Sequence, residues 1–292
     1  MPLRPRRSCL YMPGSNARAL EKAKTLPADV VIFDLEDAVA PDAKAAARNQ
    51  VAAAVQAGGF GGREIVIRVN GPQTPWGEAD MTAAAAAAPD AVLIPKVSTP
   101  GDIMVAARAL REAGAPERTR LWAMMETPLA MLNADSIVRT AVDPASRLTA
   151  LVMGTNDLAK ETRARLTPGR PAMVAWLSTC VAAARAYGVE IIDGVYNDFA
   201  DEAGLRAECE QGRDFGMDGK TLIHPNQIGP CNETFAPSQA ETAWARRVIA
   251  AFDEPANATK GALQIDGKMV ERLHAEMARR TVAIAEAIAA FE

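Results

Sequence analysis

The chain has 292 residues, 49% of them hydrophobic, which is enough for one large domain or two small ones. Its formal net charge is −4 at pH 7, so no basic excess points to nucleic acid or an anionic membrane surface as a partner. An anionic substrate would therefore have to be bound by positive charge that is gathered locally.

From the N-terminus onward, short apolar segments alternate with alanine-rich amphipathic segments. The apolar segments are nearly continuous rather than alternating in polarity, which is typical of parallel strands covered on both faces. We predict eight such strands, at residues 8–12, 30–35, 65–69, 91–95, 121–125, 149–153, 190–193 and 219–223.

Helices are predicted between these strands, at residues 16–25, 42–57, 80–88, 100–113, 172–187 and 201–215. Pro41-Asp42 is suited to begin the second of them, and Gly58-Gly59 is suited to end it. Eight strand–helix steps within about 225 residues favour an α/β fold with a closed (β/α)₈ barrel, the TIM barrel, over an open doubly wound sheet.

The alternation ends after Pro225. A helix is predicted from Pro237-Ser238 to about Phe252, followed by a link over residues 253–267 and a last helix over residues 268–291. We therefore expect a barrel domain at residues 1–237 and a C-terminal helical extension at residues 238–292. The extension either packs on its own barrel or reaches over a neighbouring subunit.

The N-terminal segment contains Arg4, Arg6 and Arg7, but the apolar stretch after them breaks at Pro13-Gly14 and is too short for a signal peptide. No apolar run approaches the roughly 18 residues that a membrane-spanning helix needs. The four cysteines form no C-x-x-C pair and only two histidines are present, which argues against a zinc cage and for reduced thiols. We expect a cytoplasmic protein.

Charged and polar residues follow the predicted strands, and in such barrels the catalytic groups lie at the C-terminal ends of the strands. The residues at these positions are Asp34, Glu36, Asp37, Arg68, Asn70, Lys96, Glu126, Asn156, Asp157, Asp193, Lys220 and His224. Carboxylates dominate this ring, and gathering them in a barrel mouth is costly unless a cation neutralises them.

The composition of the ring favours a hard metal ion. Oxygen ligands without sulfur and with little imidazole suit Mg²⁺, and Glu126 and Asp157 follow adjacent strands. A single acid of this kind could equally be a solvated loop residue or a helix cap, whereas the group together favours a metal site. The guanidinium of Arg68 is suited to bind a carboxylate or an enolate oxygen, and a structural salt bridge to one of the acids is compatible with that role.

The segment from Met12 to Arg18 predicts a turn that leads into a helix. Backbone amides at the start of a helix, together with Arg18 and Lys22, suit a phosphate group. A simple loop with a helix cap explains the same residues equally well.

These motifs together resemble the citrate lyase β-subunit family of coenzyme A ester lyases, also called HpcH/HpaI aldolases, which includes malyl-CoA lyases and malyl-CoA thioesterases. They occur in the family's order along nearly the whole chain. The motifs are Arg7-Ser8-x-Leu10-Tyr11-x-Pro13-Gly14-Ser15, Phe33-Asp34-Leu35-Glu36-Asp37-Ala38-Val39, Ile67-Arg68-Val69-Asn70, Ile94-Pro95-Lys96, Met125-Glu126-Thr127, Gly154-Thr155-Asn156-Asp157-Leu158-Ala159 and Gly219-Lys220-Thr221-Leu222-Ile223-His224-Pro225.

The resemblance implies a TIM barrel with a C-terminal helical extension and an acyl-CoA substrate. It implies Glu126 and Asp157 as ligands of Mg²⁺, for which Mn²⁺ is a possible substitute, and Arg68 as the residue that binds the thioester or enolate oxygen. It further implies an acidic pair near the metal, a coenzyme A contact region and a homotrimer or homohexamer. The acidic pair is Glu36 and Asp37, and the substrate and coenzyme A contacts are Tyr11, Arg18, Lys22 and Lys96.

The reaction is less firmly implied, because lyases of this family carry an acid–base Asp in the extension where this chain has Glu271, and often a Pro where it has Leu273. One extra methylene can displace a proton-transfer group by about 1 Å, which matters for rate. The Val-Glu-x-Leu-His form of this segment is similar to the malyl-CoA thioesterase branch, which hydrolyses the thioester to malate and coenzyme A. Trp76-Gly77 and Asp193-Gly194-Val195-Tyr196 add to this similarity.

Two alternatives stay open at this point. The same site could run a retro-Claisen cleavage of a malyl-CoA or citramalyl-CoA type substrate, releasing acetyl-CoA or propionyl-CoA with glyoxylate or another 2-oxo acid. The chain could also be the β subunit of a multi-subunit citrate lyase, whose acyl groups ride on a carrier protein. A phosphoenolpyruvate-type barrel is disfavoured, because no obvious His- or Cys-based site is present.

Overall fold

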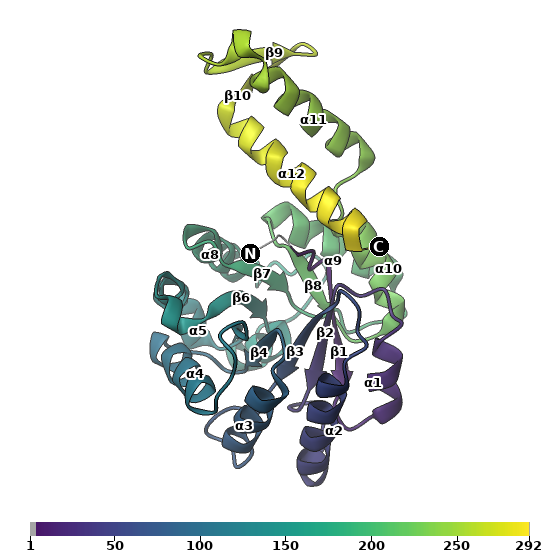
Figure 1. The fold of residues 1–292 in the computed structure, drawn as a ribbon, viewed down its shortest axis with the longest axis vertical. Helices are drawn as coiled ribbons and strands as arrows, with labels where there is room; N and C mark the ends of the chain where they lie inside the picture. Colours follow the sequence, from purple (N-terminus) through teal and green to yellow (C-terminus); the bar gives the residue numbers. More distant parts are fainter. Residues whose placement is uncertain (1–3, 292) are drawn as a thin grey trace. The chain divides into compact units, whose positions relative to one another are not determined.

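The computed structural model describes residues 4–291, and its main part is a closed barrel of eight parallel strands in the order β1 to β8 (Figure 1). The barrel closes where β1 pairs with β8, with Ser8 opposite Lys220. The predicted TIM-barrel fold is therefore confirmed. The strands are β1 (Ser8–Pro13), β2 (Val30–Asp34), β3 (Glu64–Arg68), β4 (Ala91–Ile94), β5 (Arg120–Met125), β6 (Leu148–Met153), β7 (Glu190–Asp193) and β8 (Gly219–Leu222).

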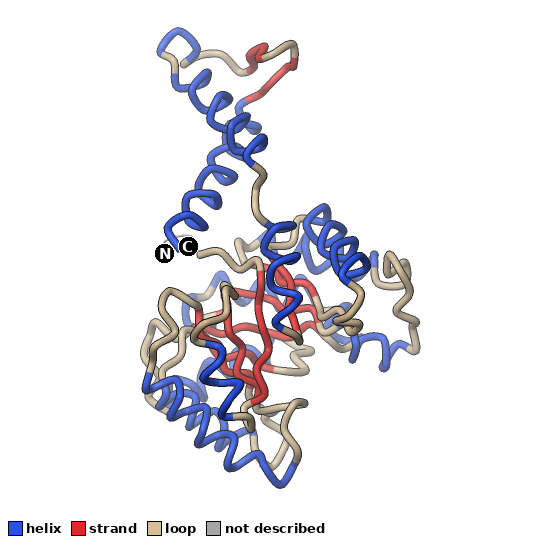
Figure 2. Tube along the Cα trace, turned by 90° about the vertical axis from the view of Figure 1, so that its right-hand side faces the viewer, coloured by secondary structure: helices blue, strands red, loops and turns tan. Residues whose placement is uncertain are grey.

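Helices surround the strands, as the tube in Figure 2 also shows. They are α1 (Ala17–Ala23), α2 (Lys44–Ala57), α3 (Gly77–Ala87), α4 (Pro100–Glu112), α5 (Pro128–Leu132), α6 (Ala134–Arg139), α7 (Thr155–Thr162), α8 (Val174–Ala186), α9 (Glu202–Phe215) and α10 (Ile228–Phe235). The predictions did not include α5, α6, α7 or α10. None of the helices in the described part of the chain combines the length and apolar character that crossing a bilayer requires.

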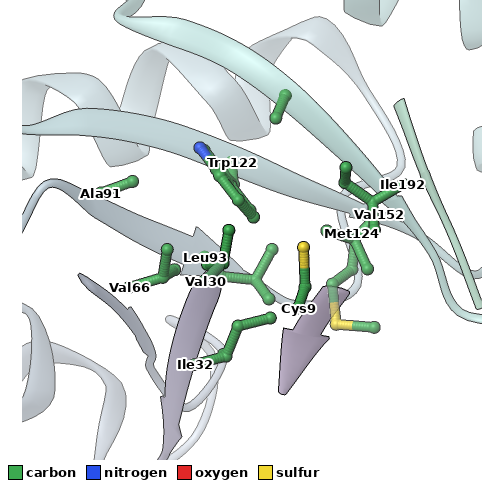
Figure 3. Close-up of a cluster of buried hydrophobic side chains, with 11 residues drawn as sticks. Cys9, Val30, Ile32, Val66, Ala91, Leu93, Trp122, Met124, Val152 and Ile192 are labelled. Atoms are coloured by element: carbon green, nitrogen blue, oxygen red, sulfur yellow. The ribbon is translucent and has the colours of Figure 1, made fainter. Parts of the chain in front are cut away.

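The barrel interior is filled by side chains from alternate strand positions, shown in Figure 3. Trp122 is fully buried there, and the Arg6 guanidinium lies 5.3 Å from its ring centroid while pairing with Glu64. The opposite faces of the strands are also buried, which is why the strand sequences lack polar alternation. The interior cluster consists of Cys9, Val30, Ile32, Val66, Ala91, Leu93, Trp122, Met124, Ala150, Val152 and Ile192.

The chain divides into two compact units, one formed by Arg6–Asn232 and one that contains the chain from Glu233 onward. The second unit contains α11 (Gln239–Asp253), a hairpin of β9 (Ala262–Ile265) and β10 (Lys268–Glu271), and α12 (Arg272–Phe291). The predicted domain boundary at residue 237 stays a prediction. Residues 1–3 and 292, at the outer ends of the two predicted domains, lie outside the described residues.

The structure corrects two boundaries in this C-terminal unit. The link predicted over residues 253–267 contains the strand β9, and the last helix begins at Arg272 rather than at Lys268. Lys268–Glu271 instead pairs antiparallel with β9 through a turn in which Asp266 and Gly267 both have positive φ. The unit has its own apolar core, which consists of Ala245, Val248, Phe252, Val270, Ala275 and Ala278.

Candidate active site

A cavity of about 330 Å³ opens among residues at and just beyond the C-terminal ends of the barrel strands. Five of the predicted site residues line it, namely Tyr11, Asp37, Arg68, Glu126 and Asp157. The other lining residues are Asp34, Ala38, Met124, Met153, Gly154, Thr155, Asn156, Val195, Thr221 and Ile223. One part of the lining is therefore strongly charged, and the rest is mostly apolar.

Arg68, the last residue of β3, is held by Asp34, the last residue of β2. Its Nε and Nη2 donate to the two carboxylate oxygens of Asp34, each at 2.7 Å, so the pair is bidentate. Burial alone would raise the pKa of Asp34, but Arg68 and the amides of Glu36 and Ala38 outweigh it and hold that pKa below its ordinary value. The salt bridge anticipated for Arg68 therefore exists, and it fixes the plane of the guanidinium.

The predicted acidic pair also contacts Arg68. Glu36 Oε2 lies 3.0 Å and Asp37 Oδ2 lies 3.4 Å from Arg68 Nη1. Burial raises the pKa of Glu36 to about 8, because the attraction of Arg68 opposes this rise only in part and repulsion from Asp37 and other nearby acids adds to it. The Asp37 side chain is 70% exposed, so the two acids of the pair occupy very different environments.

Tyr11 lies beneath the guanidinium. Arg68 Cζ is 4.8 Å from the centroid of the Tyr11 ring, a cation–π arrangement, and the Tyr11 hydroxyl contacts Met124 Sδ at 3.9 Å. Burial raises the pKa of the Tyr11 hydroxyl, which therefore stays neutral at physiological pH. Arg68 is thus positioned by an aromatic face as well as by carboxylates.

The two predicted metal ligands are linked through Lys96. The Lys96 amide donates to Glu126 Oε1 at 2.7 Å, and the Lys96 ammonium donates to Asp157 Oδ1. Lys96 has a φ of 56°, a left-handed conformation that is uncommon for a residue other than glycine. Burial raises the pKa of Glu126 to about 7, and the Asp157 charge adds to this effect while Lys96 opposes it.

The donor set of this cavity suits a divalent oxygen-seeking ion. Glu126 is buried and close enough to Asp157 for their charges to repel. A cation between them would offset both the cost of burying the Glu126 charge and this repulsion. Among residues 4–291, no group of three or more His, Cys, Asp or Glu is placed to hold a metal. The protein therefore offers two carboxylates, and Mg²⁺ commonly fills its other positions with water and substrate. Mg²⁺ fits this arrangement better than zinc does.

The backbone beside Glu126 is adapted to that side chain. Gly154, which precedes α7, leaves the space in which the Glu126 carboxylate lies, because a Cβ there would meet Glu126 Cβ at 2.4 Å and Oε2 at 2.5 Å. Helix α7 begins immediately afterward and carries Asp157 in its first turn. The close approach of β5 and β6 thereby places Glu126 and Asp157 in the same cavity.

Two residues of the expected ring serve another purpose. Lys220 Nζ lies 3.0 Å from Asp193 Oδ2 and 2.6 Å from Glu208 Oε1, and Arg170 Nη1 lies 2.7 Å from Asp193 Oδ1. Lys220 and Asp193 are fully buried. This four-residue network joins β7 and β8 to α9 and to the loop before α8, so Asp193 and Lys220 stabilise the barrel wall.

Arg18, Lys22 and Glu271 do not line the cavity. Arg18 and Lys22 are exposed on α1, so their predicted contact with coenzyme A stays a prediction. Glu271 ends β10 in the C-terminal unit, where its amide donates to His274 Nδ1 at 3.0 Å. Its predicted catalytic role likewise stays a prediction.

Asp34 was predicted at the ring without a role, and the apolar part of the cavity lining was not predicted. Asp34 lies near the end of the predicted strand 30–35, which precedes the strand of Arg68 in the chain, so its place beside Arg68 could have been inferred from the sequence. The apolar lining residues Met124, Met153, Val195 and Ile223 carry no such signal, because they lie in or beside strands that contain many other apolar residues.

Sequence comparisons place the chain among known proteins. A family model described as HpcH/HpaI aldolase/citrate lyase matches residues 7–225. The chain is 54% identical over 287 residues to a (3S)-malyl-CoA thioesterase of Cereibacter sphaeroides strain KD131, covering 98% of this chain and 97% of that protein. It is 34% identical over 288 residues to citrate lyase subunit beta of Escherichia coli K12, covering 97% of this chain and 94% of that protein.

A solved structure agrees with these relatives. It is CitE from Mycobacterium tuberculosis in complex with magnesium, acetoacetate and coenzyme A, which matches with a TM-score of 0.77 at 28% identity, covering 97% of this chain and 98% of that one. The resemblance predicted from the sequence motifs is confirmed at both levels, the family and the similarity to the thioesterase branch. With its barrel and its sequence in agreement, this chain belongs to the HpcH/HpaI aldolase/citrate lyase family.

Proposed function

We propose that this protein is a Mg²⁺-dependent enzyme that hydrolyses a malyl-CoA-like thioester to malate and coenzyme A. The observation that carries the proposal is the gathering of Arg68, Glu126 and Asp157 around one cavity. The similarity to a (3S)-malyl-CoA thioesterase, which extends over nearly the whole length of both proteins, supports the substrate and the reaction. The magnesium and coenzyme A in the related CitE structure support the cofactor and the carrier of the acyl group.

Glu126 and Asp157 would hold the metal ion, for which Mn²⁺ is a possible substitute. When bound, Mg²⁺ supplies Lewis-acid polarisation of the oxygens that the acyl group presents to it. Lys96 contacts both carboxylates and keeps them oriented toward the cavity. We assign Lys96 a role in binding the acyl group of the substrate.

Arg68 stabilises negative charge on the thioester carbonyl oxygen as water attacks the carbon. Its guanidinium is fixed in advance by Asp34 and Tyr11, so no reorganisation is needed when charge develops. Collapse of the tetrahedral adduct breaks the C–S bond, and the coenzyme A thiolate leaves and takes up a proton. Asp37, which is exposed and contacts Arg68, is placed to accept the proton of the attacking water, and Glu36, whose raised pKa keeps it protonated at neutral pH, is placed to donate a proton to the leaving thiolate.

The C-terminal unit contributes Glu271 as a further acid–base group, at its own cavity or at that of a neighbouring subunit. A homotrimer or homohexamer is part of this proposal. The exposed apolar side chains Met269, Leu273 and Met277, which are close to Glu271 in the chain, support an interface with a second copy. Sedimentation equilibrium of the purified protein tests it, and a monomer at micromolar concentration would contradict it.

A second candidate function is C–C cleavage of the same substrate class to acetyl-CoA or propionyl-CoA and a 2-oxo acid. The similarity to citrate lyase subunit beta favours it, and the charges of the cavity would serve either reaction. A β-subunit role would show itself as activity toward an acyl carrier protein only.

The cytoplasm is the location we propose, in keeping with four buried cysteines that are all free thiols.

Product analysis separates these functions. Purified protein is incubated with malyl-CoA and Mg²⁺, and free thiol and glyoxylate are followed separately, with a chelator as the control. Free thiol without glyoxylate, lost on chelation, is the result expected for the thioesterase. Glyoxylate without stoichiometric thiol would replace the proposed reaction by cleavage of the C–C bond.

A further inference from the structure

Lys44, the first residue of α2, is a buried lysine that the proposed reaction does not use. It is only 6% exposed, and its ammonium donates to the main-chain carbonyls of Leu35 at 3.0 Å and Glu36 at 2.9 Å. The ring of Trp76 covers the ammonium at 5.0 Å. Lys44 forms no ion pair with any described residue. Burying a cation without a counter-ion is costly. The hydrogen bonds that Lys44 donates to the two carbonyls should therefore serve a purpose that offsets this cost.

The two carbonyls that Lys44 binds lie on either side of the Glu36 Cα. A peptide group is planar, and the planes before and after a residue define its only two soft backbone torsions. Holding the Leu35 and Glu36 carbonyls in place therefore fixes the backbone of Glu36 and the direction in which its side chain leaves. That side chain reaches Arg68 Nη1 at 3.0 Å.

The same loop is held from other directions, and Lys44 completes its hydrogen bonding. Asn70 Nδ2 also donates to the Leu35 carbonyl, at 2.8 Å, and the Val39 amide donates to the Glu36 carbonyl, at 3.1 Å. With Lys44 added, each carbonyl accepts two hydrogen bonds, which is the number its lone pairs allow. The peptide planes that contain the Leu35 and Glu36 carbonyls are therefore each held by two hydrogen bonds.

We infer that Lys44 is a positioning residue that sets the Glu36 carboxyl group against Arg68 from behind the acidic loop. Trp76 shields the ammonium, so the charge remains directed at the two carbonyls. This inference rests on the proposed function, because it assigns Lys44 to the geometry of that reaction.

The first variant to test is Lys44→Met, which keeps the length of the side chain and removes its donors and charge. The turnover number should fall roughly 10- to 100-fold, since a displacement of about 1 Å costs about 100-fold in rate, while KM and Mg²⁺ affinity stay within about twofold. Lys24→Met is the matched control, because the Lys24 ammonium also lies over a ring, that of Phe60, but within residues 4–291 it donates only to the Glu21 carboxylate. It should leave turnover unchanged.

A double-mutant cycle distinguishes positioning from general stabilisation. If Lys44 acts through Glu36, then Lys44→Met should cause little further loss in a Glu36→Gln background. An equal loss in both backgrounds, or wild-type turnover in Lys44→Met, would overturn the inference. If Lys44→Met does not fold, Lys44→Gln replaces it in the cycle, because its amide still donates one hydrogen bond.

Crystallography gives a readout that does not depend on activity. In the Lys44→Met protein, the Glu36 carboxyl group should have moved away from Arg68, and an unchanged contact at 3.0 Å would reject the inference. The proposed function fails in a different way, namely through the products of the wild-type protein. If those products include glyoxylate, the cycle is followed through glyoxylate release and remains a test of Lys44.

Discussion

At the scale of single residues, Arg68 shows how much of its position depends on Asp34. Both ends of the guanidinium fork are bound by that carboxylate, which is itself almost completely buried. The charge of Arg68 is therefore available to a substrate only in the orientation that Asp34 sets. Removing the charge of Asp34 would leave the buried guanidinium with only its single contacts to Glu36 and Asp37.

Asp34→Asn should accordingly impair both folding stability and catalysis. The free energy of unfolding should fall by about 3–5 kcal/mol, as for other broken buried pairs. Turnover should fall by about 100-fold, because the guanidinium is no longer fixed. Asp29→Asn is the matched control, since Asp29 forms a buried pair with Arg7 outside the cavity. It should lose similar stability but keep its turnover per folded molecule, and equal catalytic losses in both variants would refute the role of Asp34.

Asp157→Ala should abolish metal-dependent turnover while leaving the fold intact, because this carboxylate is partly exposed and, among the described residues, pairs only with Lys96. Mg²⁺ binding followed by calorimetry should be lost in parallel. Glu161→Ala, an exposed position on the same helix, is the control and should behave like the native protein. Undiminished activity of Asp157→Ala would remove the metal assignment.

Glu36 gives a prediction for pH. Its pKa is raised to about 8 from an ordinary value of 4.5, so the stability it contributes is present below 4.5 and is lost as the pH rises through 8. Glu36→Gln cannot ionise and should gain about 1–3 kcal/mol relative to the native protein between about pH 6 and about pH 9. Urea unfolding with a chelator present measures the difference. A difference that is independent of pH would show that Glu36 is not buried in the way described.

At the scale of elements, the approach of β5 and β6 brings the two metal ligands into one cavity, and Gly154 is the residue that permits it. Gly154→Ala should displace the Glu126 carboxylate, because the added Cβ would lie 2.5 Å from its Oε2. Mg²⁺ affinity should fall by about tenfold or more, a cost of about 1.4 kcal/mol. Gly229→Ala in α10 is the control, since a Cβ there meets nothing within 4 Å. Calorimetric titration with Mg²⁺ compares them, and equal affinities would reject the steric argument.

Elements with a strong apolar pattern could be predicted from the sequence, and elements formed through pairing or short helical turns could not. All eight barrel strands are almost entirely buried on both faces and were recognised. Helices α5 and α6 are each too short to show an amphipathic period. The strand β10 was included in a helix because its four residues continue directly into α12, and only the turn at Asp266-Gly267 distinguishes them.

At the scale of the whole molecule, barrel topology explains which part of the site could be foreseen. Every strand end points to one mouth, so a list of residues at strand ends contained Arg68, Glu126 and Asp157 without any knowledge of contacts. That list could not distinguish Asp34, which lies in the cavity, from Asp193, which lies in the wall. The distinction depends on which way a side chain leaves the strand, and that is set by register across the whole barrel.

Closure of the barrel has a consequence for how the protein emerges during translation. Strand β1 pairs with β2 on one side and can pair on its other side only once β8 has been made. The cavity likewise needs both ends of the barrel, because Tyr11 from β1 and Ile223 from beyond β8 line it. A nascent chain that ends before β8 therefore has two open sheet edges and an incomplete cavity. The C-terminal extension delays the end of synthesis until after β8 has been made, so the barrel can close while the chain is still attached to the ribosome.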